Sequence, residues 1–357
     1  MVWRSKTKME NILIDDFKSI ADSDLPFEEF KNSSFVITGA TGLIGSLLVR
    51  ALLYCNRVHD LNLKVYAVVR NADKANGIFG EEIPALEYIV ADLAKDDIEG
   101  AFGCDYVIHA AAVTTSKLMV SDPVGTIRTA IDGTEKLLKL AVEKKAKSFV
   151  YISSMEVYGQ PKTEGKTAEK DLGYIDIGTV RSCYPEGKRM CECLCNAYAS
   201  QYGLNVKSAR LAQTFGAGIL PTENRVFAQF ARSAMNGENI VLHTTGESEG
   251  NYVYTSDAIR AILLLLVRGE SGEAYNIANE ESHTTIRNMA ELVADKIAGN
   301  AIRVVLDIPE DSASLGYAPP VKMWLDASKM RSLGWEPVVS LTDSYRRMIA
   351  YMKEQSE

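Results

Sequence analysis

A glycine-rich turn that follows an apolar run limits what this chain can fold into more than any other feature. Residues 35–37 read FVI, residues 38–45 read TGATGLIG, and a segment with helical spacing of apolar residues follows. In a strand–turn–helix unit, Gly39 allows the tight turn, Gly42 lets backbone amides approach a pyrophosphate, and Gly45 lets the helix pack close to the strand. Unpaired amides at the helix N-terminus favour bound phosphate. We therefore predict a dinucleotide site here, the alternative being an ordinary strand–helix turn.

Composition and charge exclude several classes of protein. The chain has 357 residues, of which 46% are hydrophobic, and a formal net charge of −8. This acidic balance argues against nucleic acid and anionic membrane surfaces as partners. The longest apolar run, 261–267, is too short to span a bilayer, and no apolar segment of a secretory signal follows the first residues. We expect a cytoplasmic protein that binds neither nucleic acid nor membranes.

The six cysteines and four histidines offer no metal-binding pattern. Cys191, Cys193 and Cys195 alternate along one segment, whereas a metal site draws ligands from more than one element. We interpret these cysteines as small core residues, since free cysteine is among the most buried residue types. His109 ends a predicted strand, and we expect its role to be structural. No metal ion is predicted.

Apolar runs alternate with helical patterns between residues 33 and 210. Continuous apolar runs of this kind are typical of parallel strands buried on both faces, and repeated strand–helix–strand units build a doubly wound sheet. The predicted strands are 35–37, 64–69, 86–90, 106–108, 148–152 and 205–209. We predict an α/β fold, with a Rossmann-type doubly wound parallel sheet and a smaller C-terminal α/β substrate lobe.

This pattern divides the chain into three parts. Residues 1–32 are polar and acidic with one short amphipathic piece, and we expect them to form an N-terminal arm. Residues 33–215 carry the strand–helix units and form the predicted NAD(P)-binding Rossmann domain. Residues 216–357 form mainly the substrate-binding lobe, with 251–280 expected to return to the Rossmann domain.

Tyr184 and Lys188 lie four residues apart, a spacing that places both side chains on one face of a helix. A nearby ammonium lowers the pKa of a tyrosine, which can then exchange a proton with a substrate hydroxyl or carbonyl. Such a pair is common by chance on a protein surface. Here, however, Ser154 and Glu156 follow the end of a predicted strand, at the sheet edge where ligands bind in open α/β sheets. The two segments together favour an active site.

These motifs and their order resemble extended short-chain dehydrogenase/reductases of the NAD(P)-dependent nucleotide-sugar epimerase/dehydratase family, over about residues 33–350. The resemblance rests on the glycine turn, Asp92-Leu93, HAAA at 109–112, SMEVYG at 154–159, Tyr184 with Lys188, and LGWEP at 333–337. The segment 181–189, RSCYPEGKR, is especially similar to UDP-glucuronate decarboxylases.

The resemblance implies roles for individual residues. Tyr184 would be the acid/base, and Lys188 would lower its pKa and hold the nicotinamide ribose. Ser154 would hydrogen-bond the reacting oxygen, and Glu156 would act as a base or orient the sugar. The implied cofactor-binding residues are Gly39, Thr41, Gly42, Leu43, Ile44, Gly45, Arg70, Asn71, Asp92, Leu93, Ala110, Ala111, Ala112, Tyr184 and Lys188. The implied substrate-binding residues are Thr114, Gln213 and Arg225.

Departures from the family pattern are informative. Met155 stands where 4,6-dehydratases usually have an aspartate that protonates the leaving hydroxyl, which argues against a standard 4,6-dehydration. Gly250 replaces an arginine that normally grips the substrate diphosphate, and Arg225 is a candidate substitute. Arg70 ends the second strand, where NAD enzymes usually carry an acid, and an arginine there suits a 2′-phosphate. We therefore expect NADP(H) to be favoured, unless Arg70 is only a solvated cation at the strand end.

The resemblance implies NAD(P)-dependent modification of a nucleotide-activated sugar by hydride transfer at a carbinol carbon. A retained NAD would allow a transient ketone to be epimerised or decarboxylated before hydride returns, an outcome that Glu156 favours. An exchanging NADPH would give a reductase of a nucleotide-linked keto-sugar, an outcome that Arg70 favours. A non-catalytic dinucleotide-binding sensor is a further alternative, although it has no need of Ser154, Tyr184 and Lys188 together.

We also expect a homodimer. Extended relatives pair through the helix that carries the tyrosine motif and the helix before the Ser154 strand, here roughly 184–202 and 126–144. Two-fold closure is the commonest symmetry of oligomers. The apolar positions at helical spacing on these helices include Leu137, Leu138, Leu140, Leu194 and Tyr198.

Overall fold

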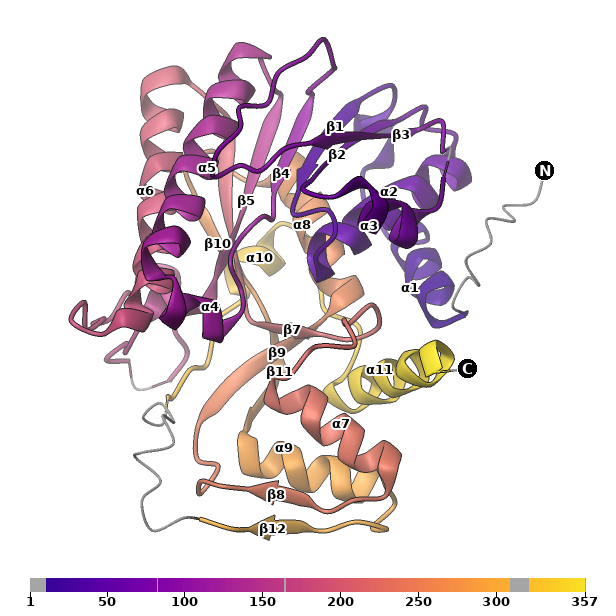
Figure 1. Ribbon diagram of the computed structural model, residues 1–357, viewed down its shortest axis with the longest axis vertical. Coiled ribbons are helices and arrows are strands. Elements are labelled where there is room, and N and C mark those ends of the chain that lie inside the picture. Colours follow the sequence, from indigo (N-terminus) through magenta and orange to yellow (C-terminus); the bar gives the residue numbers. More distant parts are fainter. Residues whose placement is uncertain (1–10, 82, 164, 309–320, 357) are drawn as a thin grey trace.

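A seven-stranded parallel sheet organises the larger lobe of the molecule (Figure 1). The computed structural model describes residues 11–81, 83–163, 165–308 and 321–356. The strand order is β3-β2-β1-β4-β5-β6-β10, and every neighbouring pair is parallel. The strands are β1 (Ser34–Thr38), β2 (Lys64–Val69), β3 (Leu86–Val90), β4 (Tyr106–His109), β5 (Ser148–Ser154), β6 (Val206–Leu211) and β10 (Ala274–Ile277). The six predicted strands are confirmed. From β1 the chain adds β2 and β3 on one side and then β4, β5 and β6 on the other, so the strand order reverses between β1 and β4, where doubly wound folds bind ligands.

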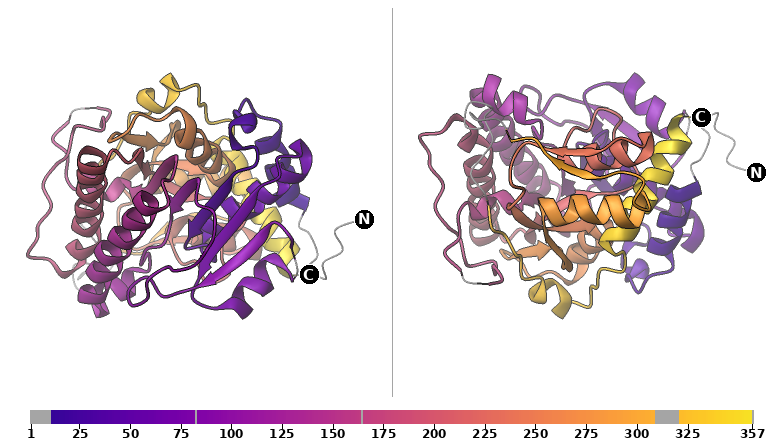
Figure 2. Two further views of the ribbon diagram at one scale, coloured as in Figure 1. Left: turned by 90° about the horizontal axis from the view of Figure 1, so that it is seen from above. Right: turned by 90° about the horizontal axis from the view of Figure 1, so that it is seen from below.

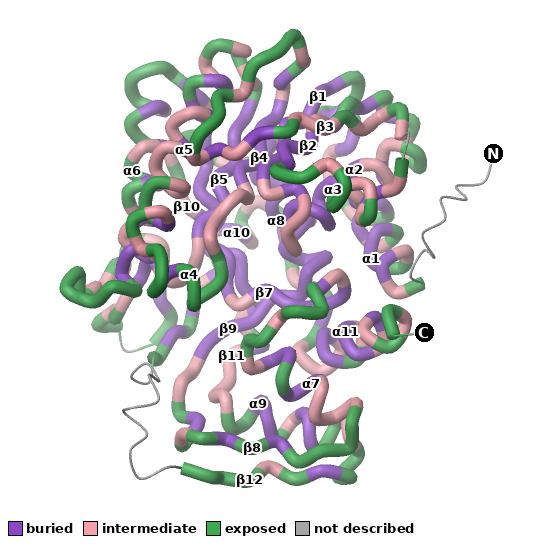
Figure 3. Tube along the Cα trace, viewed as in Figure 1, coloured by how far each residue is buried: buried purple, intermediate pink, exposed green. Residues whose placement is uncertain are grey.

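Helices cover both faces of this sheet, because successive side chains of a buried strand point to opposite sides (Figure 2). Phe35 and Ile37 of β1 pack in the core beneath α2 and α8, whereas Val36 packs in the core beneath α5 and α6. The strands in the middle of the sheet are accordingly buried (Figure 3). The helices of this lobe are α2 (Leu43–His59), α3 (Ala72–Phe79), α4 (Ser116–Ser121), α5 (Pro123–Glu143), α6 (Cys183–Tyr202), α8 (Thr255–Arg268) and α10 (Ser328–Ser332). The predicted Rossmann-type α/β fold is confirmed.

A smaller lobe contains two short sheets of its own (Figure 1). One has the order β11-β9-β7 and the other pairs β12 with β8. Its strands are β7 (Gln213–Phe215), β8 (Ile240–Leu242), β9 (Glu249–Tyr254), β11 (Asn279–Thr285) and β12 (Val304–Leu306), and its helices are α7 (Val226–Asn236), α9 (Ile286–Leu292) and α11 (Leu341–Ser356). After β7, β8 and β9 the chain returns to the larger lobe with α8 and β10, since β9 pairs with β7 and not with the central sheet. It returns a second time with α10.

The N-terminal segment forms α1 (Asn11–Ala21), which packs against α2, α8 and α11. Its Asp16 is buried and accepts hydrogen bonds of 2.6 Å from the Tyr254 hydroxyl and from Arg347 Nη1. Burial raises the pKa of Asp16 to about 6. Residues 1–10 of the expected arm lie outside the described residues. The helix α1 thus packs on α2 and α8 of the larger lobe, while its buried carboxylate is hydrogen-bonded to β9 and α11 of the smaller lobe.

Within the described part of the chain, no helix combines the length and the apolar character that a membrane crossing requires.

Candidate active site

At the glycine turn, the backbone after β1 contacts both the backbone after β4 and the first turn of α2. Gly39 has φ +63°, and a Cβ there would lie 2.7 Å from Ala111 N and 2.8 Å from Ala110 O. A Cβ at Gly45 would lie 2.2 Å from Gly39 O. Gly42 caps α2, whose first residue is Leu43. Since any side chain at Gly39 or Gly45 would collide with backbone, only glycine permits this turn, and the helix N-terminus it leaves open fits a dinucleotide pyrophosphate.

A buried histidine braces the strand beside this turn. His109 Nδ1 lies 2.7 Å from Thr38 Oγ1, and its Nε2 lies 3.1 Å from Thr134 Oγ1. Thr38 Oγ1 also accepts a hydrogen bond of 3.2 Å from the Ala111 amide. Burial lowers the pKa of His109 to about 3, so the ring is neutral. Its position is that of a structural residue, as the sequence predicts.

The other expected cofactor residues lie at the same edge of the sheet. Arg70 is exposed where β2 ends, and the Asn71 side chain caps α3 by accepting a 2.8 Å hydrogen bond from the Lys74 amide. Asp92 and Leu93 follow β3, and Leu93 is buried against α5. Because these strands are parallel neighbours, the residues that follow β1, β2, β3 and β4 lie at one edge of the sheet.

Ser154, Tyr184 and Lys188 meet where β5 ends beside the first turns of α6. Ser154 is the last residue of β5 and accepts a 3.2 Å hydrogen bond from the Glu156 amide. The Lys188 side chain is buried, and its Nζ donates a 2.6 Å hydrogen bond to Ile152 O. Nζ also lies 5.9 Å from the centre of the Tyr184 ring. The helical spacing thus places Tyr184 and Lys188 on the face that contacts β5.

The pKa of Tyr184 differs in direction from the sequence-based expectation. Burial raises it to about 12, and the Glu156 carboxylate raises it too, while hydrogen bonding to Ser154 and the charges of Arg181 and Arg225 lower it. The expected lowering by Lys188 is not found. The cause is burial, which outweighs the nearby cations and also lowers the pKa of Lys188 to about 8.

Glu156 is held by an arginine that sequence reasoning did not single out. Arg181 Nη1 lies 2.5 Å from Glu156 Oε2, and Nη2 lies 3.0 Å from Oε1. Glu156 lies in the 3₁₀ turn η2 (Met155–Tyr158), and Arg181 lies in η3 (Val180–Ser182), directly before α6. The partners are separated by 25 residues, so no local pattern could have revealed the pair.

The three expected substrate residues lie on separate elements of the two lobes. Thr114 is exposed after β4, and Gln213 is half-buried at the start of β7. Arg225 precedes α7, and its Nη2 lies 2.6 Å from Glu223 Oε2. Arg225 is close enough to lower the pKa of Tyr184. It can therefore face a substrate bound there, although Glu223 already occupies its guanidinium.

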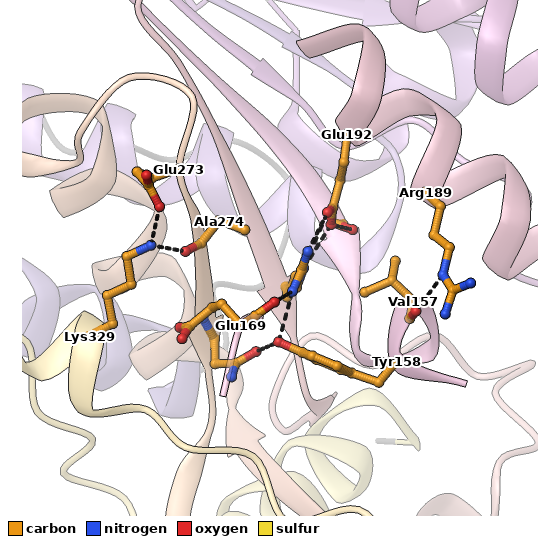
Figure 4. A network of polar contacts seen from close by, with 11 residues as sticks. Val157, Tyr158, Glu169, Arg189, Glu192, Glu273, Ala274 and Lys329 are labelled. Carbon is orange, nitrogen blue, oxygen red and sulfur yellow. Dashed lines mark hydrogen bonds and ion pairs between the residues drawn. The ribbon is translucent and has the colours of Figure 1, made fainter. Parts of the chain in front are cut away.

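A buried network of polar contacts joins α6 to the strands of the central sheet (Figure 4). Glu192 lies one turn beyond Lys188 and accepts a 2.5 Å hydrogen bond from the Ser153 hydroxyl. It also forms an ion pair with Arg210, whose Nη2 lies 2.6 Å from Glu192 Oε2. Arg210 Nη1 donates to the Tyr158 hydroxyl at 3.0 Å, and that hydroxyl donates to Asn276 Oδ1 at 2.6 Å. The network therefore fixes α6 against β5, β6 and β10.

The cysteines behave as expected with one exception. Cys191 and Cys195 are buried, but Cys193 is exposed because it points away from the face of α6 that packs on the sheet. All six cysteines are free. Among the described residues, no group of three or more histidine, cysteine or acidic side chains is placed to hold a metal ion.

Comparison with known proteins gives a consistent result. The model of the NAD dependent epimerase/dehydratase family matches residues 35–278. UDP-glucuronic acid decarboxylase 6 of Arabidopsis thaliana is 30% identical over 314 residues, covering 87% of this chain and 86% of the relative. UDP-glucuronic acid decarboxylase 1 of Xenopus tropicalis is 27% identical over 325 residues, covering 90% of this chain and 72% of the relative.

Two solved structures show the same fold. UDP-glucose 4-epimerase of Thermotoga maritima, determined with UDP-glucose, has a TM-score of 0.74 and 23% identity, covering 91% of this chain and all of that chain. UDP-glucuronic acid 4-epimerase of Bacillus cereus, determined with UDP-glucuronic acid and NAD, has a TM-score of 0.71 and 22% identity, covering 90% of this chain and 99% of that chain.

Proposed function

As the chain belongs to the NAD dependent epimerase/dehydratase family, we propose that this enzyme oxidises a carbinol of a UDP-linked uronic acid to a transient ketone. The observation that carries the proposal is the meeting of Ser154 and Tyr184 above the buried Lys188, beside the glycine turn. We choose a uronic acid as the substrate because this chain is similar, over most of its length, to UDP-glucuronic acid decarboxylases.

The chain's own residues supply binding and proton transfer. The N-terminus of α2 would hold the pyrophosphate of the cofactor, and Lys188 and Tyr184 would face its nicotinamide end. When bound, NAD⁺ supplies a hydride acceptor and a positive charge that favours the Tyr184 phenolate. Tyr184 Oη then takes the proton of the sugar hydroxyl, while Ser154 hydrogen-bonds the same oxygen. Proton transfer therefore requires no metal-bound water.

Decarboxylation is the proposed fate of the ketone. A carboxylate one carbon removed from a ketone leaves readily as carbon dioxide, because the electrons left behind delocalise onto the ketone oxygen. The enolate would then take up a proton from water at the carbon that lost the carboxylate, and return of the hydride to the ketone would leave no net oxidation. Met155 has no proton to donate to a leaving hydroxyl, so dehydration is not proposed. Epimerisation, in which hydride returns to the opposite face, is the competing outcome within the same chemistry.

The test is incubation of the purified protein with UDP-glucuronic acid and NAD⁺, followed by mass spectrometry of the nucleotide sugars. Loss of the mass of carbon dioxide supports decarboxylation. A product of unchanged mass but different chromatographic mobility identifies an epimerase instead. Unaltered UDP-glucuronic acid overturns the choice of substrate. Mass spectrometry of the protein as purified, with any cofactor or product it retains, gives an independent view of both ligands.

A second candidate function is the NADPH-dependent reduction of a nucleotide-linked keto-sugar. Arg70 favours it, since the exposed guanidinium stands at the end of β2 and suits a 2′-phosphate. In this direction Tyr184 would donate its proton to the keto oxygen. The raised pKa of Tyr184, about 12, keeps the phenol protonated and so suits a donor.

We propose a homodimer that is formed by a different set of side chains from those expected. Leu137, Leu138 and Leu140 are buried in the core of their own chain and cannot meet a partner. The exposed apolar side chains on α4, α5, η3 and α6 include Leu118, Val120, Val124, Ile127, Val180 and Met190. We call these six residues the α5/α6 patch. A second copy of the chain is its proposed occupant, related by a two-fold axis.

A cytoplasmic location is also proposed. All six cysteines are free, and five of them are buried. Unpaired cysteines are typical of proteins in reducing compartments. A location in an oxidising compartment would instead favour disulfide pairing.

A further inference from the structure

The Glu156–Arg181 pair joins the two segments that carry the reacting groups. Glu156 lies two residues after Ser154, and Arg181 lies three residues before Tyr184. Both guanidinium nitrogens of the fork meet both carboxylate oxygens, at 2.5 Å and 3.0 Å. A bidentate pair of this kind fixes direction as well as distance. The pair therefore sets how η2 and the start of α6 lie relative to each other.

This contact changes what Glu156 can do. With both oxygens engaged by the guanidinium fork, the Glu156 carboxylate cannot turn toward another group without breaking two charge-assisted hydrogen bonds. The two side chains are 29% and 43% exposed, so water reaches the pair and screens part of its charge. Glu156 is thus held in place and partly neutralised, and it is not free to leave Arg181 without cost.

Several charged and polar groups face Tyr184 from different elements. Glu156 in η2 raises its pKa, while Ser154 at the end of β5, Arg181 in η3 and Arg225 before α7 lower it. Lys188, from the same helix, lies beneath the ring and donates its hydrogen bond to Ile152 O. Glu156 and Arg181 therefore act on the same phenol with opposite sign, while bonded to each other.

We propose that Arg181 is a positioning residue of the active site, which acts through Glu156 by holding that carboxylate beside Tyr184 and balancing its charge at the phenol. The inference rests on the proposed function in one respect only, that Tyr184 is the group that transfers the proton. Neither the sugar nor the fate of the ketone enters the argument.

Opposite substitutions then have opposite effects. Arg181→Met leaves an uncompensated carboxylate near the phenol and moves the Tyr184 titration to higher pH. Glu156→Gln removes the carboxylate and moves the titration to lower pH. Each shift is expected to be about 0.5–1 pH unit, less than the 1–3 units of a close unscreened charge, because both side chains are partly exposed. The double variant Arg181→Met/Glu156→Gln returns close to the wild type.

The primary measurement is NMR titration of protein labelled with ring-¹³C tyrosine and saturated with NAD⁺. The Tyr184 resonance is identified by its loss in Tyr184→Phe. Arg346→Met is the matched control, since Arg346 is exposed on α11 and pairs only locally with Asp343. The control is expected to titrate like the wild type. The pH dependence of kcat/KM with UDP-glucuronic acid is the second readout, with its rising limb moving in the same directions.

The NMR titration tests the role of Arg181, and the turnover measurement tests the proposed substrate separately. Shifts of the same sign in both single variants, or no shift in either, overturn the role of Arg181. If Arg181→Met does not fold, Arg181→Lys keeps the charge but loses the fork, and an unchanged titration with a lowered kcat supports positioning. An unchanged kcat in that variant contradicts it. Failure to turn over UDP-glucuronic acid overturns the proposed substrate but leaves the NMR titration able to test Arg181.

Discussion

At the Tyr184 hydroxyl, burial and charge act against each other. A phenol packed away from water holds its proton, and the pKa of Tyr184 accordingly rises to about 12. The ammonium that could oppose this, Lys188, directs a hydrogen bond to the Ile152 carbonyl. A bound cationic nicotinamide would then supply the charge that the cofactor-free site lacks. In the proposed mechanism, transfer of the sugar proton to Tyr184 would therefore become favourable only when the cofactor is bound.

We expect Tyr184→Phe to lose at least ~10²-fold in kcat, the usual scale for removal of a general acid–base group. The ring is kept, so the packing on β5 is retained and NAD⁺ affinity should be close to that of the wild type. Steady-state kinetics with UDP-glucuronic acid and calorimetric titration with NAD⁺ measure the two effects. Turnover near the wild-type rate would remove Tyr184 from the mechanism.

Arg70 provides a test of cofactor choice. The guanidinium is exposed at the end of β2, where it can bind a 2′-phosphate bidentately and stack on adenine. Arg70→Ala is expected to weaken NADP(H) binding by roughly 1–3 kcal/mol, the range of a hydrogen bond to a charged group, and to change NAD(H) binding much less. Fluorescence titrations with both reduced cofactors measure this. Equal losses, or a clear NAD(H) preference in the wild type, would count against the NADPH-dependent reductase.

At the scale of elements, α6 is attached to the sheet by charge as well as by apolar packing. Arg210→Met is expected to lower the free energy of unfolding by about 3–5 kcal/mol, because it leaves Glu192 buried without its cation. The double variant Arg210→Met/Glu192→Met should be less destabilised than Arg210→Met, since it removes both charges. Urea unfolding of the two variants measures the difference. A double variant no more stable than the single would show that the pair itself is not the cause.

The helix α1 gives a prediction about pH. The folded pKa of Asp16, about 6, lies above the ordinary aspartate value of 3.8, so the folded state binds this proton more tightly than the unfolded chain. The stability that protonated Asp16 contributes is complete below about pH 4 and is lost as pH rises through about 6. The loss is up to about 3 kcal/mol, at about 1.4 kcal/mol for each pKa unit.

Asp16→Asn cannot make this titration. We expect the wild type to lose stability relative to Asp16→Asn between about pH 4 and about pH 7. Urea unfolding at both pH values measures the two free energies. A constant difference between the proteins would contradict the raised pKa of Asp16.

The sequence predicts most elements but few of the contacts between them. The strands of the central sheet can be predicted because their segments are rich in apolar residues. The roles of Gly39 and Gly45 can be predicted because a side chain at either position would collide with the backbone of the turn. The Glu156–Arg181 pair, the attachment of Glu192 to Arg210, and the burial of Tyr184 cannot be predicted in this way. Each depends on residues distant in the chain, whose proximity exists only after folding. The direction of the Tyr184 pKa was missed for this reason.

At the scale of the whole molecule, the α5/α6 patch makes assembly testable. Val124 is 69% exposed, so Val124→Glu is expected to leave the fold of the chain intact while placing a charge in the α5/α6 patch. We expect the wild type to be a dimer and Val124→Glu a monomer by light scattering at micromolar concentration. Val338→Glu, at a residue that is 63% exposed and lies outside the α5/α6 patch, is the matched control and should remain dimeric. A monomeric wild type would refute the dimer.

The place of β10 in the chain has a consequence for synthesis of the protein on the ribosome. The strand that completes the central sheet beside β6 is made after β7, β8 and β9 of the smaller lobe. Until residue 277 has emerged, the nascent chain therefore presents the backbone of β6 as an open edge, which is a template for aggregation. Asn276, which also bonds Tyr158, arrives with this strand. A chain whose translation stalls within the smaller lobe therefore lacks the strand that covers this edge of β6.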